Sequence, residues 1–136
     1  MKVHSTNYYD TFIEVSEDTR ATCGTKPPSK QNKTVAEHLY DLISSNPYRF
    51  TSDEILFKVF AERNDLHESE MNQANEIFFS KGQPCFRASP LAKSYGFGIH
   101  FDAEGKVSIY GRETDEYQKL LDDECIKKVK AMRGGK

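Results

Sequence analysis

The sequence has no tryptophan, and it has no apolar run long enough for a secretory signal or a membrane span. Its opening residues, MKVHSTNYYD, lack the apolar stretch of about 7 to 15 residues that a signal peptide needs. No later segment approaches the roughly 18 consecutive apolar residues of a transmembrane helix. We therefore expect a cytoplasmic protein that has no membrane as a partner.

Cysteine is also scarce, since the chain has only Cys23, Cys85 and Cys125. An odd number of widely spaced cysteines favours reduced thiols over a disulfide framework. Neither the cysteines nor the four histidines show CxxC, HExxH or a similar ligand spacing, so we expect no metal site. Gly96 and Gly98 lack the third glycine of a dinucleotide-binding motif, and we expect no cofactor.

The length and composition of the chain indicate one domain over residues 1–136. A chain of 136 residues has the commonest size of a single domain. Nine phenylalanines and seven tyrosines supply much of the apolar surface that a core needs. The net charge of −2 provides no overall attraction to nucleic acid.

Two segments at the N-terminal end differ sharply in character. Residues 8–15 are rich in β-branched and aromatic side chains that nearly alternate with polar ones, which predicts a strand. Residues 19–33 combine glycine, two adjacent prolines and several lysines without apolar periodicity. We expect a mobile loop with few tertiary contacts there, and a flexible basic tail from about residue 133.

Helix-start signals recur along the middle of the chain. Thr34 and Thr51 are each followed three residues later by glutamate, the capping-box spacing, so we expect helices over 34–45 and 51–63. Ser89 before Pro90 opens a short helix that ends near Gly96.

Two further helices are expected, one between the Thr51 helix and Ser89 and one after the Ser89 helix. The first starts at Ser69, buries the stripe Ala74, Ile77 and Phe78, and ends at Gly82. The second starts at Thr114 and continues through the apolar positions Tyr117, Leu120, Leu121, Val129 and Met132.

Between the helices that start at Ser89 and Thr114, the apolar period changes to two, which predicts a hairpin over residues 97–110. Only a three-residue loop, 103–105, keeps the apolar residues of both strands on one face. This register pairs Phe101 with Val107, Ile99 with Ile109 and His100 with Ser108. It also places Gly105 where such loops require a left-handed residue. 

Together these elements predict an α+β fold. We expect a small antiparallel sheet, in which the N-terminal strand lies beside the hairpin, packed against four to five helices that cover one face.

Several segments of the sequence resemble one known family. They are TNYYDTFIEV at 6–15, NPY at 46–48, FAERN at 60–64 and, most specifically, FSKGQPCFRASPLAK at 79–93. Together they are similar to the family catalogued as domain of unknown function 6157. The resemblance implies a protein that stands alone, and it brings no reaction, cofactor or catalytic residue.

The link of residues 81–90 carries a thiol, a guanidinium and a helix-capping hydroxyl, which a connection between helices seldom needs. Arg87 and the free backbone N–H groups at the start of the helix that Ser89 opens could hold a carboxylate or phosphate. The plain alternative is that Ser89 only caps its helix, Cys85 is a small buried side chain, and Arg87 pairs with a nearby acid. 

The hairpin offers a second set of polar groups. His100 and Tyr110 share one strand face with Gly98 and Ser108, which predicts either one wall of a pocket or a solvated face. We expect any site to lie where the link meets the hairpin. Its candidate ligand-binding residues are Arg87, Ser89, Tyr95, His100 and Tyr110.

Three function classes follow from these candidates. The first is a binding module for a small anionic molecule or a protein partner. The second is an enzyme with catalytic Cys85 and His100, because a thiolate nucleophile needs a nearby base. The third is a winged-helix nucleic-acid binder, although Glu68, Glu70 and Glu76 on its recognition helix would repel phosphates.

Overall fold

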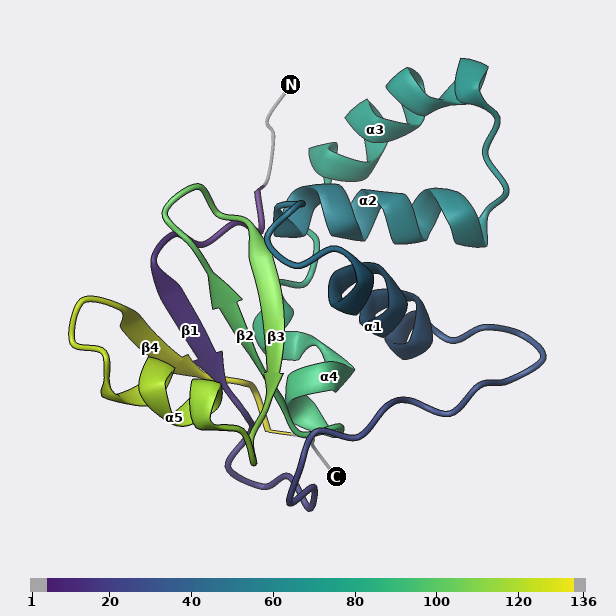
Figure 1. The fold of residues 1–136 in the computed structure, drawn as a ribbon. Helices are drawn as coiled ribbons and strands as arrows, with labels where there is room; N and C mark the ends of the chain where they lie inside the picture. The colour runs from purple at the N-terminus through teal and green to yellow at the C-terminus, as the bar shows by residue number, and fades with distance from the viewer. Residues whose placement is uncertain (1–4, 134–136) are drawn as a thin grey trace.

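The computed structural model describes residues 5–133 and shows an α+β fold (Figure 1). Its elements follow in the order β1 (Thr11–Glu14), α1 (Val35–Ser45), α2 (Ser52–Arg63), a 3-10 turn (Glu68–Glu70), α3 (Met71–Ser80), a second 3-10 turn (Phe86–Ala88), α4 (Pro90–Lys93), β2 (Phe97–Phe101), β3 (Val107–Gly111), α5 (Asp115–Asp122) and β4 (Lys127–Lys130).

The predicted capping residues start their helices. Thr51 and Glu54 form both hydrogen bonds of a capping box at the start of α2, and Thr34 accepts the Glu37 N–H at the start of α1. Ser89 caps α4 and Thr114 caps α5 through their hydroxyl oxygens. Local sequence therefore determines where these four helices begin.

The strands form one sheet of order β3-β2-β1-β4. The hairpin of β2 and β3 has the predicted register, with Phe101 opposite Val107 and Ile99 opposite Ile109. Gly105 has a φ of 82°, the left-handed conformation that the three-residue loop requires. The N-terminal strand β1 lies antiparallel to β2, as expected.

The fourth strand, β4, corrects the prediction of a helix that continues to Met132. Helix α5 ends at Asp122, and residues 127–130 pair in parallel with β1, so the sheet is mixed rather than antiparallel. The spacing of Val129 and Met132 fitted a helix, but Val129 lies between lysines in an edge strand. Such lysines are typical of edge strands that avoid further pairing.

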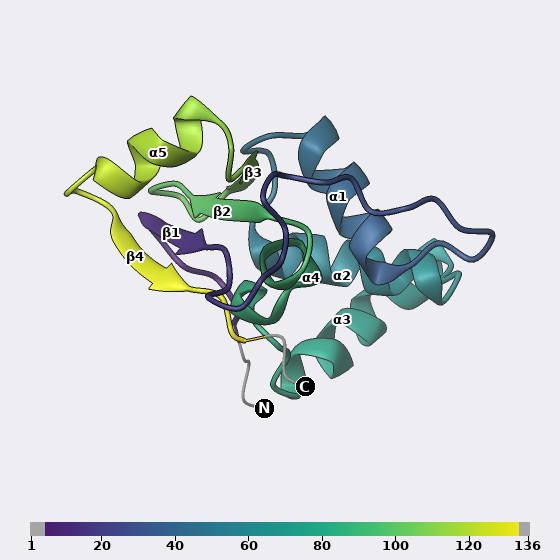
Figure 2. The ribbon, with the colours of Figure 1, turned by 90° about the horizontal axis from the view of Figure 1, so that it is seen from below.

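Helices cover both faces of the sheet, not one face as expected. Helices α1 to α4 lie on one side, and α5 lies on the other (Figures 1 and 2). The main core on the α1 to α4 side includes Ile13, Ile99 and Phe101 from the strands, together with apolar side chains of the helices. On the α5 side, a second cluster is built around Phe12 and Tyr117.

The segment 19–33 is only partly the contact-poor loop that we expected. The Gly24 N–H donates to the Glu113 carboxylate, and the Thr25 N–H donates to the Tyr95 carbonyl. Pro27 is fully buried, whereas residues 28–33 are exposed. The prediction of few tertiary contacts is therefore wrong for residues 21–27, because backbone hydrogen bonds and one proline anchor a segment that lacks apolar periodicity.

Helix α3 also differs from the prediction, because none of its residues is fully buried. Ile77, expected in a buried stripe, is 51% exposed. The helix instead folds back along α2 as one arm of a helical hairpin (Figure 1). Its Phe78 and Phe79 rings pack against Phe57 and Phe60 of α2, with centroids 4.8–6.5 Å apart.

No helix in the part of the chain that the structure describes has the length and apolar character that a membrane crossing requires. Of the basic tail expected from about residue 133, Arg133 forms an ion pair with Glu17 at 3.1 Å. Residues 134–136 lie outside the described residues.

Candidate functional site

The 81–90 link places Cys85 beside a tyrosine from the N-terminal segment. The Tyr8 hydroxyl donates a hydrogen bond to the Cys85 sulfur at 3.3 Å. Burial and this hydrogen bond raise the pKa of Tyr8 to about 12. Cys85 therefore has a phenol as its polar neighbour.

Arg87 turns away from the link toward the last strand. Its Nε donates to the Lys130 carbonyl at 2.7 Å, and its own carbonyl accepts the Met132 N–H at 2.8 Å. These two bonds fasten the end of β4 to the link. Arg87 thus has a structural contact that the sequence analysis did not consider.

The structure does not bring Cys85 and His100 together. Successive side chains of a strand point to opposite faces, so His100 and Phe101 lie on different sides of β2. Phe101 packs against Tyr8, the hydrogen-bond partner of Cys85, and against Phe86. Cys85 therefore lies on the α1 to α4 side of the sheet and His100 on the α5 side, which removes the juxtaposition that a cysteine-histidine enzyme requires.

Two other candidates occupy structural positions on the α1 to α4 side. The Ser89 hydroxyl accepts the Leu91 N–H, and Ser89 is buried at the start of α4. Tyr95 packs against the main core, and its carbonyl anchors Thr25. The five expected ligand-binding residues therefore do not form one site.

His100 and Tyr110 do come together, through a tyrosine that the sequence analysis missed. The Tyr48 hydroxyl lies 2.8 Å from Nδ1 of His100 and 2.6 Å from the Tyr110 hydroxyl. We call these three residues the Tyr48 network. Their side chains come from three segments: the connection between α1 and α2, strand β2 and strand β3.

The backbone places Tyr48 precisely enough to form this network. Tyr48 has a φ of 58°, which is unusual for a residue other than glycine, and its N–H donates to the Val107 carbonyl at 2.9 Å. The Val107 N–H in turn donates to the Phe50 carbonyl. The sequence analysis left residues 46–50 between two expected helices, and it gave no sign that they pair with β3.

Burial shapes the titration of this network. It lowers the pKa of His100, against the opposing influence of nearby carboxylates, of which Asp102 has the largest effect. Burial and the hydrogen bond to Tyr110 raise the pKa of Tyr48. Burial therefore favours the neutral forms of His100 and Tyr48.

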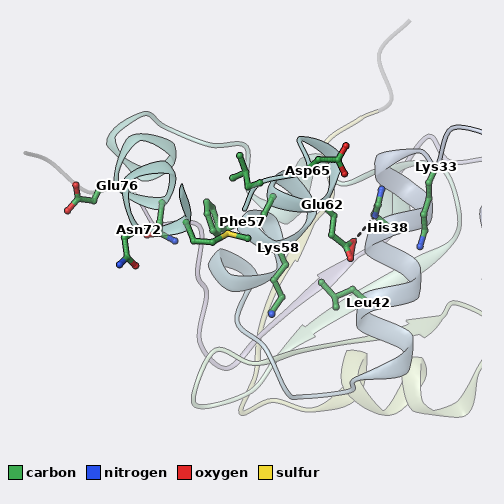
Figure 3. Close-up of a pocket in the computed structure, with 13 residues that line it drawn as sticks. Lys33, His38, Leu42, Phe57, Lys58, Glu62, Asp65, Asn72 and Glu76 are labelled. Carbon is green, nitrogen blue, oxygen red and sulfur yellow. Dashed lines mark hydrogen bonds and ion pairs between the residues drawn. The ribbon is translucent and has the colours of Figure 1, made fainter. Parts of the chain in front are cut away.

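A separate cavity of about 1180 Å³ lies between α1 and the hairpin of α2 and α3, and we call it the helical pocket (Figure 3). Its lining comes from these three helices and the turns beside them: Lys33, His38, Leu42, Phe57, Lys58, Ala61, Glu62, Asp65, Leu66, Met71, Asn72, Asn75 and Glu76.

The charged side chains of the helical pocket have different partners. His38 Nδ1 lies 3.1 Å from the Glu62 carboxylate, as the dashed line in Figure 3 marks. Lys33 forms an ion pair with Asp41 at 2.8 Å. The Lys58 ammonium group lies 4.8 Å from the centroid of the Phe50 ring and has no carboxylate partner among residues 5–133.

Sequence reasoning missed the helical pocket because it expected the stripe Ala74, Ile77 and Phe78 of α3 to be buried. The exposed polar residues Asn72, Asn75 and Glu76 on α3 were the available signal, since they leave one side of that helix open. Among the described residues, no group of histidine, cysteine and acidic side chains could hold a metal ion.

The comparisons with known proteins identify a family but no activity. The model of a family of unknown function, DUF6157, matches residues 3–136, nearly the whole chain. The chain belongs to this family, which confirms the resemblance seen in the sequence. No curated protein and no solved structure matches.

Proposed function

We propose that this member of the DUF6157 family is a small cytoplasmic binding module. Its ligand is a small molecule with an apolar body and one anionic group, and it binds in the helical pocket. The observation that carries the proposal is a cavity of about 1180 Å³ that combines apolar side chains with an ammonium group lacking a carboxylate partner in the described chain.

The apolar part of the pocket comes from all three helices. Leu42 of α1, Phe57 of α2 and Met71 of α3 line it together with Ala61 and Leu66. Binding sites for small molecules are typically concave and mostly apolar, with a few polar groups that fix orientation. Such a lining favours a ligand whose body is a ring system or an alkyl chain.

The distribution of charge favours an anionic group beside Lys58. Figure 3 shows Glu76 at the opposite end of the pocket from Lys33, with Lys58 between them. The Glu62 carboxylate already pairs with His38. An anion beside Lys58 would form an ion pair with its ammonium group without displacing an existing ion pair.

The same lining disfavours nucleic acid as the ligand. Asp65 and Glu76 bring negative charge to the pocket beside its two lysines. A phosphate backbone requires a continuous cationic surface, which this pocket does not have.

The experiment uses anilinonaphthalenesulfonate, a fluorescent probe with an apolar body and one sulfonate. We expect saturable binding with one site per chain, and a loss of affinity of about tenfold in Lys58→Glu, equivalent to about 1.4 kcal/mol. The control is Lys119→Glu, which makes the same charge change at an exposed position of α5, on the other side of the sheet.

The binding titration and the comparison of the two variants can each overturn the proposal. Binding that never saturates would mean that the probe coats exposed apolar surface instead of entering a pocket. An equal loss of affinity in Lys58→Glu and Lys119→Glu would mean that the probe responds to overall charge. Perturbation of His38 and Met71 in two-dimensional NMR spectra should report where the probe binds.

A further inference from the structure

We propose that the Tyr48 network is a second functional site, in which His100 exchanges a proton with a substrate and Tyr48 and Tyr110 relay that proton to solvent. This site is separate from the helical pocket and adds acid–base chemistry to a module proposed only to bind.

The two short contacts of the Tyr48 hydroxyl carry the argument. Each phenol has one proton to donate, whereas its oxygen can accept hydrogen bonds. With the Tyr48 oxygen 2.8 Å from the His100 ring and 2.6 Å from the Tyr110 oxygen, the three groups form one continuous chain of hydrogen bonds.

This chain can run in either direction, and the direction fixes the tautomer of His100. In one direction Tyr110 donates to Tyr48, and Tyr48 donates to Nδ1, so the ring proton is on Nε2. In the other direction Nδ1 donates to Tyr48, and Tyr48 donates to Tyr110, so Nε2 carries the lone pair. Only the second arrangement makes Nε2 a base.

Nε2 is the atom available to a substrate. His100 is only half-buried, and Nε2 has no hydrogen-bond partner within residues 5–133. Tyr110 is also partly exposed, which gives the other end of the chain access to water. Both directions keep the two hydrogen bonds of this chain, so neither tautomer of His100 breaks a contact with Tyr48.

The proton step balances without a further reactant. Nε2 takes a proton from a cationic N–H group of the substrate, which keeps the electron pair of the broken bond and becomes neutral, and Nδ1 passes its proton to the Tyr48 oxygen. The Tyr48 proton moves to Tyr110, and the Tyr110 proton leaves to water. One proton has then moved from the substrate to solvent, and His100 ends as the neutral Nε2–H tautomer.

The charges around His100 select the substrate. Asp102 after β2, Asp10 before β1 and Asp123 after α5 all act on the imidazole electrostatically, and Asp102 also acts on Tyr48. These carboxylates repel an anion. We infer that the substrate is cationic, such as a protonated amine, which also distinguishes it from the anionic ligand of the helical pocket.

The test uses Tyr110→Phe, which removes the relay while leaving the contact of Tyr48 with His100. Tyr48 then retains Nδ1 as its only acceptor among the described side chains, which favours the Nε2–H tautomer of His100. Nitrogen NMR of the imidazole should show a mixture of tautomers in the wild-type protein and a clearly larger share of the Nε2–H tautomer in Tyr110→Phe. A wild-type spectrum that already shows the pure Nε2–H tautomer would overturn the proposal, whether or not the variant folds.

Chemical modification gives a second readout that a structural role would not change. Diethyl pyrocarbonate acylates a ring nitrogen that has a free lone pair, so its rate at His100 follows the tautomer that exposes Nε2 as a base. We expect the rate at His100 to fall several-fold in Tyr110→Phe. The exposed His67 of the same protein serves as the internal reference, and an unchanged ratio of the two rates would contradict the relay.

Discussion

The ring of Tyr117 stands edge-on against the ring of Phe12, with the two centroids 5.0 Å apart. The Tyr117 hydroxyl also accepts a hydrogen bond of 3.0 Å from the Val15 N–H. Both rings lie over Gly98 of β2, where an added Cβ would lie 2.4 Å from Phe12 and 2.6 Å from Tyr117. Helix α5 therefore attaches to the sheet at a point that has no room for a side chain.

Gly98→Ala should lower the free energy of unfolding by about 1–3 kcal/mol, because the new methyl group overpacks two buried rings. Urea denaturation measures this change. Gly82→Ala is the matched control, since no atom lies within 4 Å of its added Cβ, and it should be neutral or stabilising by less than about 1 kcal/mol. Equal stability of the two variants would mean that α5 does not depend on close packing at Gly98.

The hairpin and the starts of α1, α2, α4 and α5 were predictable because their determinants are local, whereas α3 begins at Met71 and not at the expected Ser69. The register of Ile99 with Ile109 follows from the requirement that apolar side chains share one face. The β4 strand was not predictable in this way. Val129 is one apolar residue among lysines, and β4 forms because the backbone of β1 lies beside it.

Two proline substitutions test whether β4 is a strand. The Lys127 N–H donates to the Asp10 carbonyl just before β1, and the Ala131 N–H donates to the Glu14 carbonyl of β1. By alternation the Val129 N–H also faces β1 and the Lys128 N–H faces away. Val129→Pro should lower the free energy of unfolding by at least about 1–2 kcal/mol, and Lys128→Pro by clearly less. Equal losses from the two prolines, measured by thermal denaturation, would favour the helix that the apolar spacing indicated.

The candidate site was predictable only in part, for a related reason. The alternation of the hairpin correctly placed His100 and Tyr110 on one face. It could not show that Tyr48 joins them, because Tyr48 reaches His100 through a left-handed turn and a backbone bond to β3. Cys85 is near His100 in sequence but on the other side of the sheet, and the sequence gives no information on which face the link covers.

The buried tyrosines predict a loss of stability at alkaline pH. The pKa of Tyr8 is raised from 10 to about 12, and burial also raises the pKa of Tyr48 and Tyr117. Above pH 10 the folded protein therefore holds protons that the unfolded chain has released. By linkage, this stabilisation is fully present below pH 10 and declines as the pH rises toward 12.

Chemical denaturation at a series of pH values should show that this decline is less steep in Tyr8→Phe than in the wild-type protein. Tyr9→Phe is the control, because Tyr9 is 57% exposed and the substitution is chemically identical. A decline as steep in Tyr8→Phe as in Tyr9→Phe would mean that Tyr8 ionises alike in the folded and unfolded states.

Glu37 carries the last prediction, because one oxygen of its buried carboxylate has no hydrogen-bond partner among the described residues. The side chain is 8% exposed, and its Oε1 has no hydrogen-bond partner among the described residues. An unsatisfied buried polar group destabilises a fold by about 1–3 kcal/mol, which exceeds the roughly 0.3–1 kcal/mol that an acidic residue gains near a helix N-terminus. Thr34 accepts the backbone N–H of Glu37, and that bond survives a change of side chain.

Glu37→Met should therefore raise the free energy of unfolding by about 1 kcal/mol, since methionine fills a similar volume and needs no partner. Glu116→Met makes the same change at an exposed position in the first turn of α5. There only the favourable interaction with the helix N-terminus is lost, so stability should fall slightly. Opposite signs for the two variants in urea denaturation are the expected result. Destabilisation by both would show that the Glu37 carboxylate has a stabilising role in the folded protein, for example through Lys33, whose pKa it helps to raise.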